Sequence, residues 1–326
     1  KSTFISRFMD LVVLPNMKDA YEKERTRDEL PQSGAGKTIM TTEPKFVPGE
    51  AVEITLAEKA RAAVRMVDCV GYTVPGALGY EEANFPRMVR TPWFDEEVSF
   101  QEAAEIGTQK VIQEHSTIGL VVTTDGSITE IKREDYVDAE RRVIAELREL
   151  GKPFIVVLNS THPESDDTRG LGETLAAAYD VPVIPVDCLR MSTDDIMGVL
   201  GGVLSEFPVR EISVRLPDWV AELDETHPVR AGFIAGVRQA VDSVDKVRDV
   251  QGAVQARGMT KNAQSAIVTL LDLGTGRVLI ELTAPRALFY TVISEMIGAE
   301  VEGDSDVMRM MRGLTHAKRE YDKVAT

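Results

Sequence analysis

The residues with the clearest chemical potential stand at the start of the chain. Lys1-Ser2-Thr3 leads into an apolar segment that contains Phe4 and Phe8, which matches the last part of the phosphate-binding pattern G-x-x-x-x-G-K-[ST]. In that pattern the lysine contacts the β- and γ-phosphate oxygens, and the next hydroxyl binds Mg²⁺. The glycines would lie just upstream of Lys1. An ordinary helix start with a Ser or Thr cap is the commoner explanation of such a tripeptide.

A second candidate group follows an apolar strand. Residues 51–56 and 63–67 are predicted to form a strand pair, and the second strand leads into Asp68-Cys69-Val70-Gly71, the D-x-x-G pattern of phosphate-loop nucleotidases. Its aspartate binds Mg²⁺ through water, and its glycine N–H can meet the γ-phosphate. The pattern is common by chance, but here it ends a predicted buried strand downstream of the K-S-T helix. This order predicts a magnesium-bound triphosphate site with Lys1, Ser2, Thr3, Asp68 and Gly71 around it.

The segment between these two groups is Gly- and Thr-rich and lies where a nucleotide-sensing loop belongs. In such loops a threonine closes on Mg²⁺ and the γ-phosphate, so that the loop depends on the nucleotide state. Thr41 and Thr42 are the candidates for this catalytic role. A strand entry before Pro44 is the alternative interpretation of the same two residues.

Tyr72 follows Gly71, at the position where small regulatory GTPases carry the glutamine that orients the attacking water. Hydrolysis is therefore expected to be slow, unless another group such as Thr41 or Thr42 positions the water. The long segment from Thr73 to Ser99, rich in proline and glycine, exceeds the usual length of a connection. We interpret it as an extended second switch.

The residues expected to read the base differ from those of GTPases. Asn159-Ser160-Thr161-His162 stands where GTPases carry N-K-x-D, so the lysine and the guanine-binding aspartate are both missing. ATP is therefore the better expected substrate, although Asp166 or Asp167 could reach the base. Asn159 is a candidate nucleotide contact, and a turn residue at the end of a strand is the equally good alternative.

Regular alternation of helices and strands positions these residues. Apolar strands are predicted at residues 118–124, 153–159 and 181–186, and helices at 100–115, 133–150, 168–179 and 192–207. Continuous apolar strands between helices indicate a doubly wound parallel sheet with ligand at its carboxyl edge. We expect this edge to gather Lys1, Asp68, Asp125, Asn159 and Asp187. The fold class is α/β, a GTPase-like P-loop NTPase of the TRAFAC type, over residues 1–207.

The alternation stops at Pro208, which predicts a smaller α+β domain over residues 208–326. Its elements are a strand at 211–216, a long helix or a helix pair broken near Gly252, and a hairpin around the turn 272–276, followed by helices at 285–297 and 304–324. No acid/base pair, nucleophile or metal cluster is evident in this part. Its valine and methionine stripes are expected to form core, with a partner-binding face as the alternative.

Composition excludes some classes of function. The 326 residues carry a formal charge of −16, and such an acidic chain is a poor ligand for the phosphate backbone of nucleic acid. The four histidines are far apart, without metal-ligand spacing. Cys69 and Cys188 lie in apolar, strand-like settings, so a disulfide is not expected. Without a signal peptide or an apolar run of membrane length, the chain is expected to be cytoplasmic.

Several segments closely resemble the stage IV sporulation protein A family, the spore-coat morphogenetic ATPase of endospore-forming bacteria. They include K-S-T-F, D-L-V-V-L-P-N, D-E-L-P-Q-S and A-A-E-I-G-T, and lie at residues 1–4, 10–16, 28–33, 36–48, 67–75, 103–108 and 111–119. The similarity is strong over residues 1–160 and continues, more weakly, to Ala317-Lys318.

This resemblance implies an ATPase that uses hydrolysis to form static filaments. It further implies that the filaments coat the outer forespore membrane in the mother cell. Implied partners are the protein itself, a small amphipathic membrane peptide, and other coat and cortex morphogenetic proteins. Family roles transfer to Lys1 as the phosphate-loop lysine, Thr41 and Thr42 as sensor threonines, and Asp68 as the Walker B-type carboxylate. A GTP-type molecular switch that does not polymerise is the alternative function, and a structural protein with a vestigial site is a third.

Overall fold

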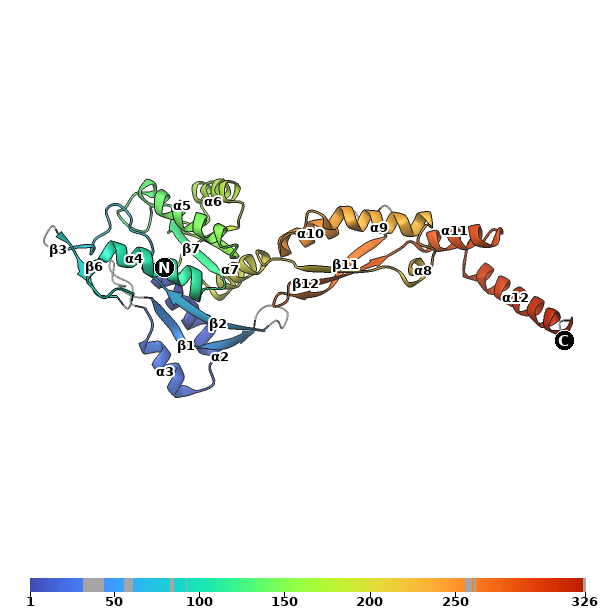
Figure 1. Cartoon of the computed structure of the whole chain (residues 1–326), viewed down its shortest axis with the longest axis horizontal. Coiled ribbons are helices and arrows are strands. Elements are labelled where there is room, and N and C mark those ends of the chain that lie inside the picture. Colours follow the sequence, from blue (N-terminus) through green and yellow to red (C-terminus); the bar gives the residue numbers. More distant parts are fainter. Residues whose placement is uncertain are drawn as a thin grey trace. The chain divides into compact units, whose positions relative to one another are not determined.

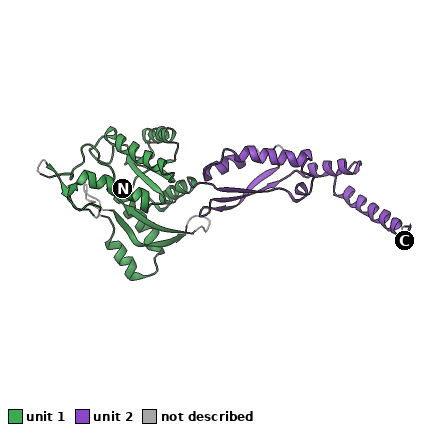
Figure 2. Ribbon diagram, in the orientation of Figure 1, with its two compact units in different colours: residues 1–206 green, residues 207–326 purple. Residues whose placement is uncertain are grey.

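The computed structural model of the chain describes residues 1–31, 44–55, 61–82, 85–91, 93–255, 260 and 262–324. Figure 1 shows the order of its helices and strands. The chain divides into two compact units, Lys1–Glu206 and Phe207–Thr326, which are coloured separately in Figure 2. Each unit has a hydrophobic core of its own.

Unit 1 contains a parallel sheet formed by β7 (Gly119–Thr124), β8 (Phe154–Asn159) and β9 (Val183–Val186), in the order β7-β8-β9. The central strand is buried from Phe154 to Leu158, as continuous apolar strands of parallel sheets are. In the register Thr124 pairs with Asn159, so the carboxyl ends of β7 and β8 meet at one edge. The prediction of a parallel sheet in this part of the chain is confirmed.

Helices cover both faces of this sheet. On one face Ile144 and Leu147 of α5 (Arg133–Glu149) pack with Val156 of β8, and α6 (Asp166–Tyr179) lies on the same face, because Gly172 approaches Pro185 and Leu158. On the other face α7 (Thr193–Ser205) packs so closely that a Cβ at Gly202 would lie 2.8 Å from Ile184. A side chain at this glycine would force the terminal methyl of Ile184 to move, so Gly202 allows the close packing.

The first residues of the chain form one continuous helical run that packs into unit 1. It comprises α1 (Ser2–Phe8), a π-helical turn (Met9–Val13) and α2 (Leu14–Asn16). Its buried apolar residues are Phe4, Ile5, Phe8, Met9, Val12, Val13 and Leu14. The charged stretch that follows contains α3 (Ala20–Asp28), which Asp19 caps by accepting the N–H of Glu22.

The strand that carries Asp68 forms the predicted pair with the strand before it, but in the described part of the chain it is not hydrogen-bonded to the parallel sheet, at whose edge Asp68 was expected. β2 (Arg61–Asp68) pairs antiparallel with β1 (Lys45–Thr55), and within the described residues this ladder is its only pairing. Short strands β3 (Glu81–Glu82), β4 (Phe85–Pro86), β5 (Met88–Val89) and β6 (Val98–Ser99) then lead to α4 (Phe100–Lys110). A π-helical turn, Val111–His115, continues α4.

Unit 2 is built on a mixed sheet in the order β10-β12-β11. Its strands are β10 (Glu211–Arg215), β11 (Ser265–Asp272) and β12 (Arg277–Thr283), with β10 parallel and β11 antiparallel to β12. The predicted hairpin is thereby confirmed. The core joins buried residues of the sheet to those of the helices: Val220, Phe233, Val250, Val278, Ile280 and Leu282.

The helices of unit 2 begin with α8 (Asp218–Ala221), and the predicted long helix is a pair, α9 (Pro228–Val241) and α10 (Val247–Gln255). The expected break near Gly252 is wrong, because Gly252 lies inside α10. The break falls instead at residues 242–246, where Asp249 accepts the N–H groups of Asp245 and Lys246 and so starts a new helix. The unit ends with α11 (Arg286–Ile297) and α12 (Asp304–Val324).

No helix in the described part of the chain is both long and apolar enough to cross a membrane.

Candidate functional site

Lys1 and Ser2 meet the end of β2. The Ser2 hydroxyl donates a hydrogen bond to Oδ2 of Asp68 at 2.8 Å, and the Lys1 ammonium lies 3.7 Å from Oδ1 of the same carboxylate. The Lys1 ammonium also donates to the carbonyls of Cys69 and Val70, the latter at 2.7 Å. The structure therefore brings together residues that are 66 or more positions apart in the sequence.

The oxygen atoms at this point suit a magnesium ion. Asp68 is buried, and its Oδ1 atom accepts no hydrogen bond from the described residues. Mg²⁺ is commonly held by one or two carboxylates together with the phosphates of a substrate. Ser2 and Asp68 offer a hydroxyl and a carboxylate side by side. The donor set thus fits the metal that the sequence predicts, with Ser2 and Asp68 as the residues that would hold it.

Gly71 lies beside this group in a backbone conformation that favours glycine. Its φ angle is +84°, and a Cβ built on it would lie 3.6 Å from Nζ of Lys1. Its N–H donates to the hydroxyl of Thr108 in α4 at 3.0 Å. Thr108 is buried and donates in turn to the carbonyl of Ala104 at 2.7 Å. The glycine of the D-x-x-G pattern is thereby held against a helix.

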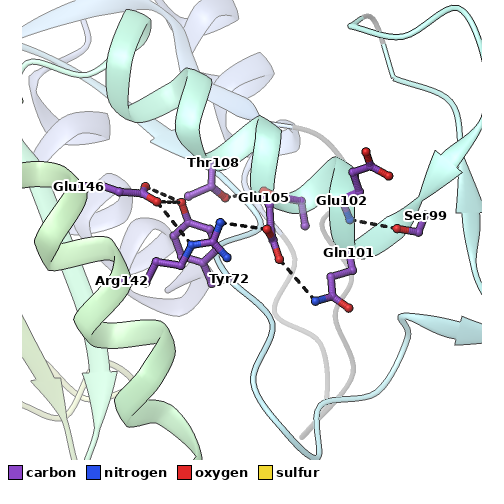
Figure 3. A network of polar contacts seen from close by, with 9 residues as sticks. Tyr72, Ser99, Gln101, Glu102, Glu105, Thr108, Arg142 and Glu146 are labelled. Atoms are coloured by element: carbon purple, nitrogen blue, oxygen red, sulfur yellow. Dashed lines mark hydrogen bonds and ion pairs between the residues drawn. The ribbon is translucent and has the colours of Figure 1, made fainter.

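Tyr72 joins the same loop to both α4 and α5, as Figure 3 shows. Its hydroxyl donates to Glu146 of α5 at 2.5 Å. The guanidinium of Arg142 lies 4.0 Å from the centre of the Tyr72 ring and pairs with Glu105 of α4 at 2.9 Å. Burial, together with the hydrogen bond to Glu146, raises the pKa of Tyr72 above its ordinary value. Tyr72 is therefore a neutral anchor at physiological pH.

Asn159 ties two loops together at the carboxyl edge of the sheet. Its side-chain oxygen accepts the N–H of Cys188 at 2.9 Å, from the loop after β9. Cys188 is buried, and burial raises the pKa of its thiol to about 11. Cys69 and Cys188 are both free. The turn interpretation of Asn159 is consistent with this bond, and its contact with a nucleotide stays a prediction.

Asp125 anchors a polar group at the end of β7. Its carboxylate accepts from the N–H and the hydroxyl of Ser127, at 2.9 and 2.6 Å, and from the Thr168 hydroxyl at 3.3 Å. Burial opposes ionisation of Asp125, but the hydrogen bonds from Ser127, Ser160 and Thr168 outweigh it and keep its pKa below the ordinary value. Asp187 directly follows β9, and its carboxylate accepts the N–H groups of Leu189 and Arg190 in the same loop.

The predicted site residues thus fall into three sets. Lys1, Ser2, Asp68 and Gly71 lie together, with Thr3 next in α1. Asn159 has its described contact with Cys188. The two predicted sensor threonines, Thr41 and Thr42, lie outside the described residues.

Sequence reasoning missed the residues of α4 and α5 that hold the D-x-x-G loop. These are Glu105, Thr108, Arg142 and Glu146. Nothing in the helical pattern around these residues marks them, and each of these hydrogen bonds joins residues at least 37 positions apart in the sequence. Only the odd tyrosine after Gly71 could have indicated a contact of this kind.

Comparison with known proteins gives matches along the whole chain. Residues 1–208 match the family model described as Stage IV sporulation protein A, ATPase domain. Residues 209–326 match the one described as Stage IV sporulation protein A, middle domain. No solved structure matches the chain.

Curated relatives agree with these domain matches. Stage IV sporulation protein A of Bacillus anthracis is 49% identical over 325 residues, that of Bacillus subtilis (strain 168) 48% over 325 residues, and that of Clostridioides difficile (strain 630) 47% over 324 residues. The alignments cover 100%, 100% and 99% of this chain, and 66% of each relative. The chain belongs to the stage IV sporulation protein A family.

Proposed function

We propose that the protein binds and hydrolyses ATP with Mg²⁺ and is a morphogenetic scaffold of sporulation. The observation that carries the proposal is the convergence of Lys1, Ser2 and Asp68, with the Ser2 hydroxyl 2.8 Å from the carboxylate. The match of residues 1–208 to a family ATPase domain supports it. A P-loop nucleotidase needs a cation for the phosphates and oxygen ligands for the metal, and these three side chains supply both.

Each residue then has a defined task. The Lys1 ammonium, which now contacts the carbonyls of Cys69 and Val70, would exchange them for phosphate oxygens when the nucleotide binds, because its side chain is long and flexible. Ser2 and Asp68 would hold Mg²⁺, which when bound would neutralise charge on the phosphates. Tyr72 cannot orient water as a glutamine does, because its hydroxyl donates to Glu146. Slow turnover follows from this anchored tyrosine.

Adenine is the base that the edge of the sheet favours. Ser160 stands at the position of the GTPase lysine, is fully buried and bonds to Thr168, so it cannot lie over a base. Thr161 and His162 bond to each other, and neither supplies the carboxylate that pairs with the guanine donors. These residues therefore lack the groups by which GTPases select guanine over adenine.

The decisive measurement is turnover of ATP and GTP, side by side, on the full chain with Mg²⁺. We expect ATP to be hydrolysed slowly and GTP more slowly still. The variant Asp68→Ala should retain nucleotide binding better than turnover, whereas Lys1→Ala should lose binding. Equal or faster use of GTP would contradict the assignment of ATP.

Unit 2 is the part that we propose makes contacts between subunits. In α12 apolar residues recur at alternating spacings of three and four, and no residue of the helix is buried. The series is Val307, Met310, Leu314, Ala317, Tyr321 and Val324. Such a series is typical of helices that pack side by side. Leu314 and Tyr321 are 59% and 72% exposed, so the stripe is available to another helix.

Charge favours a second copy of the same helix in the antiparallel direction. The start of α12 and the turn before it are acidic, with Glu300, Glu302, Asp304 and Asp306. Its later part is mainly basic, with Arg309, Arg312, Lys318, Arg319 and Lys323. Antiparallel copies would place each acidic end beside a basic one, which supports self-association.

We propose that assembly through this stripe builds the filament that forms the basement layer of the spore coat at the forespore surface. A small amphipathic membrane peptide and other coat and cortex proteins are the further partners in this proposal. Sedimentation of the full chain with and without ATP and Mg²⁺ tests the filament. Particles that grow with ATP are expected, whereas a protein that stays small with every nucleotide would indicate a switch.

A further inference from the structure

The N–H of Gly71 has two possible acceptors, the Thr108 hydroxyl and a phosphate oxygen of the nucleotide. In the structure it donates to Thr108 Oγ1 at 3.0 Å. Yet the same residue borders the phosphate-binding cation, because a Cβ on Gly71 would lie 3.6 Å from Lys1 Nζ. A γ-phosphate held by Lys1 would thus come close to an N–H that a helix already occupies. The nucleotide and the Thr108 hydroxyl compete for one donor.

Thr108 is well placed to hold this donor. Its side chain is only 2% exposed, and its own proton goes to the carbonyl of Ala104 at 2.7 Å. The oxygen is therefore left as an acceptor that faces Gly71. The Gly71 N–H is partly buried, so that without this acceptor it would have to find water or another acceptor in its place.

The next residue of the loop strengthens the same arrangement. Tyr72 donates to Glu146 at 2.5 Å and lies under Arg142, whose guanidinium pairs with Glu105 at 2.9 Å. Gly71 therefore bonds directly to α4, whereas Tyr72 contacts α5 and is linked to α4 only through the pair of Arg142 with Glu105 (Figure 3). The Tyr72 anchor keeps the loop where Thr108 can capture the Gly71 N–H.

We propose that Thr108 is a positioning residue that competes with the γ-phosphate for the N–H of Gly71, and that it thereby sets the preference for triphosphate over diphosphate. This inference rests on the proposed ATPase function. In the diphosphate complex Gly71 keeps its bond to Thr108. In the triphosphate complex it exchanges this neutral acceptor for a charged phosphate oxygen, which accepts a stronger hydrogen bond. Thr108 therefore weakens binding of the triphosphate and leaves that of the diphosphate in place.

The test is the ratio of dissociation constants for ADP and for a non-hydrolysable ATP analogue, both with Mg²⁺, on the full chain. Thr108→Val keeps the shape of the side chain and removes the acceptor, so that this side chain no longer competes with the triphosphate for the Gly71 N–H. We expect the ratio to shift roughly tenfold toward the triphosphate. Thr108→Ser keeps the hydroxyl and should leave the ratio within about twofold of the unmodified protein.

A second variant keeps the inference testable if Thr108→Val does not fold. Tyr72→Phe retains the ring under Arg142 and loses the bond to Glu146, so it should shift the ratio in the same direction by roughly two- to threefold. Its matched control is Tyr290→Phe, which removes a tyrosine–carboxylate bond, to Asp304, in unit 2. This control should leave the ratio unchanged.

The outcomes separate the two claims. Proteins that bind both nucleotides with an unchanged ratio in Thr108→Val and Tyr72→Phe would overturn this inference and leave the ATPase proposal intact. An unmodified protein that binds neither nucleotide would overturn the ATPase proposal and this inference with it. A shift in Thr108→Ser as large as that in Thr108→Val would also contradict it, because the hydroxyl would then be irrelevant.

Discussion

The two units differ in where buried polar side chains and exposed apolar side chains lie. Among the described residues, every buried polar or charged side chain except Thr260 lies in unit 1, including Asp68, Thr108 and Ser160. Both units expose some large apolar side chains, but those of unit 1 are scattered along the sequence, whereas most of those of unit 2 lie on β11 and α12: Ile267, Leu270, Leu271, Met308, Met311, Leu314 and Tyr321.

This difference indicates a different role for each unit. Buried polar groups are costly unless they are paired or functional, so unit 1 has the character of a binding site. Exposed apolar groups gathered on one element indicate a surface that contacts another protein. Variants that act on one unit and leave the other unchanged test whether the two units have separate roles.

The largest expected effect is on nucleotide binding by unit 1. Lys1→Ala removes the cation that lies 3.7 Å from Asp68 and beside Gly71. We expect at least a roughly hundredfold loss of affinity for ATP, because a charge-assisted contact to phosphate disappears. Calorimetry measures the loss. Lys110→Ala, which removes a surface pair with Glu114 in the same unit, is the control and should bind normally.

A core substitution in unit 2 should have the next largest effect, on stability alone. Phe233 is fully buried in the core of that unit. Phe233→Ala is expected to lower the free energy of unfolding by about 3–5 kcal/mol through the cavity that it leaves. Thermal unfolding measures this, with Met296→Ala at an exposed position as control. Loss of ATP binding in the folded Phe233→Ala protein would show that the units are not separable in function.

Alkaline pH should act on unit 1 through Cys188. Its pKa of about 11 in the folded state exceeds the ordinary value of 9.0, so folding favours the neutral thiol. This stability is complete below pH 9 and is lost as the pH rises toward 11, because only the unfolded chain ionises there. The contribution is on the order of 2 kcal/mol. Unfolding measured at neutral and at strongly alkaline pH should show a smaller pH effect in Cys188→Ala. An unchanged pH effect would contradict the assignment.

The smallest effect on stability is expected in α12. Leu314→Ser changes an exposed residue of the apolar stripe, so the free energy of unfolding should move by no more than about 0.5 kcal/mol. Assembly should nevertheless weaken, because the stripe would lose an apolar contact in each copy. Sedimentation measures this, with Thr315→Ala, at a neighbouring position off the stripe, as the control. Equal assembly by both variants would remove α12 from the interface.

Much of the fold could be predicted because its signals are local. The alternation of apolar strands and helices indicated the parallel sheet of unit 1, and the turn at 272–276 indicated the hairpin of β11 and β12. The break between α9 and α10 was predicted at the wrong place, because Asp249 caps the second helix by a contact that helical periodicity does not contain. The pairing of β1 with β2 was predicted correctly, because the two apolar segments lie close together in the sequence, but these segments did not indicate that β2 has no pairing with the parallel sheet among the described residues.

The residues that could do chemistry were evident from the amino-acid sequence: a lysine and a hydroxyl at a helix start, and an aspartate and a glycine after a strand. These are properties of residue type and short spacing. Three contacts are evident only in the tertiary structure: Ser2 donates to Asp68, Gly71 donates to Thr108, and Tyr72 donates to Glu146. Such contacts depend on how helices and strands pack, and packing joins residues that no local pattern connects.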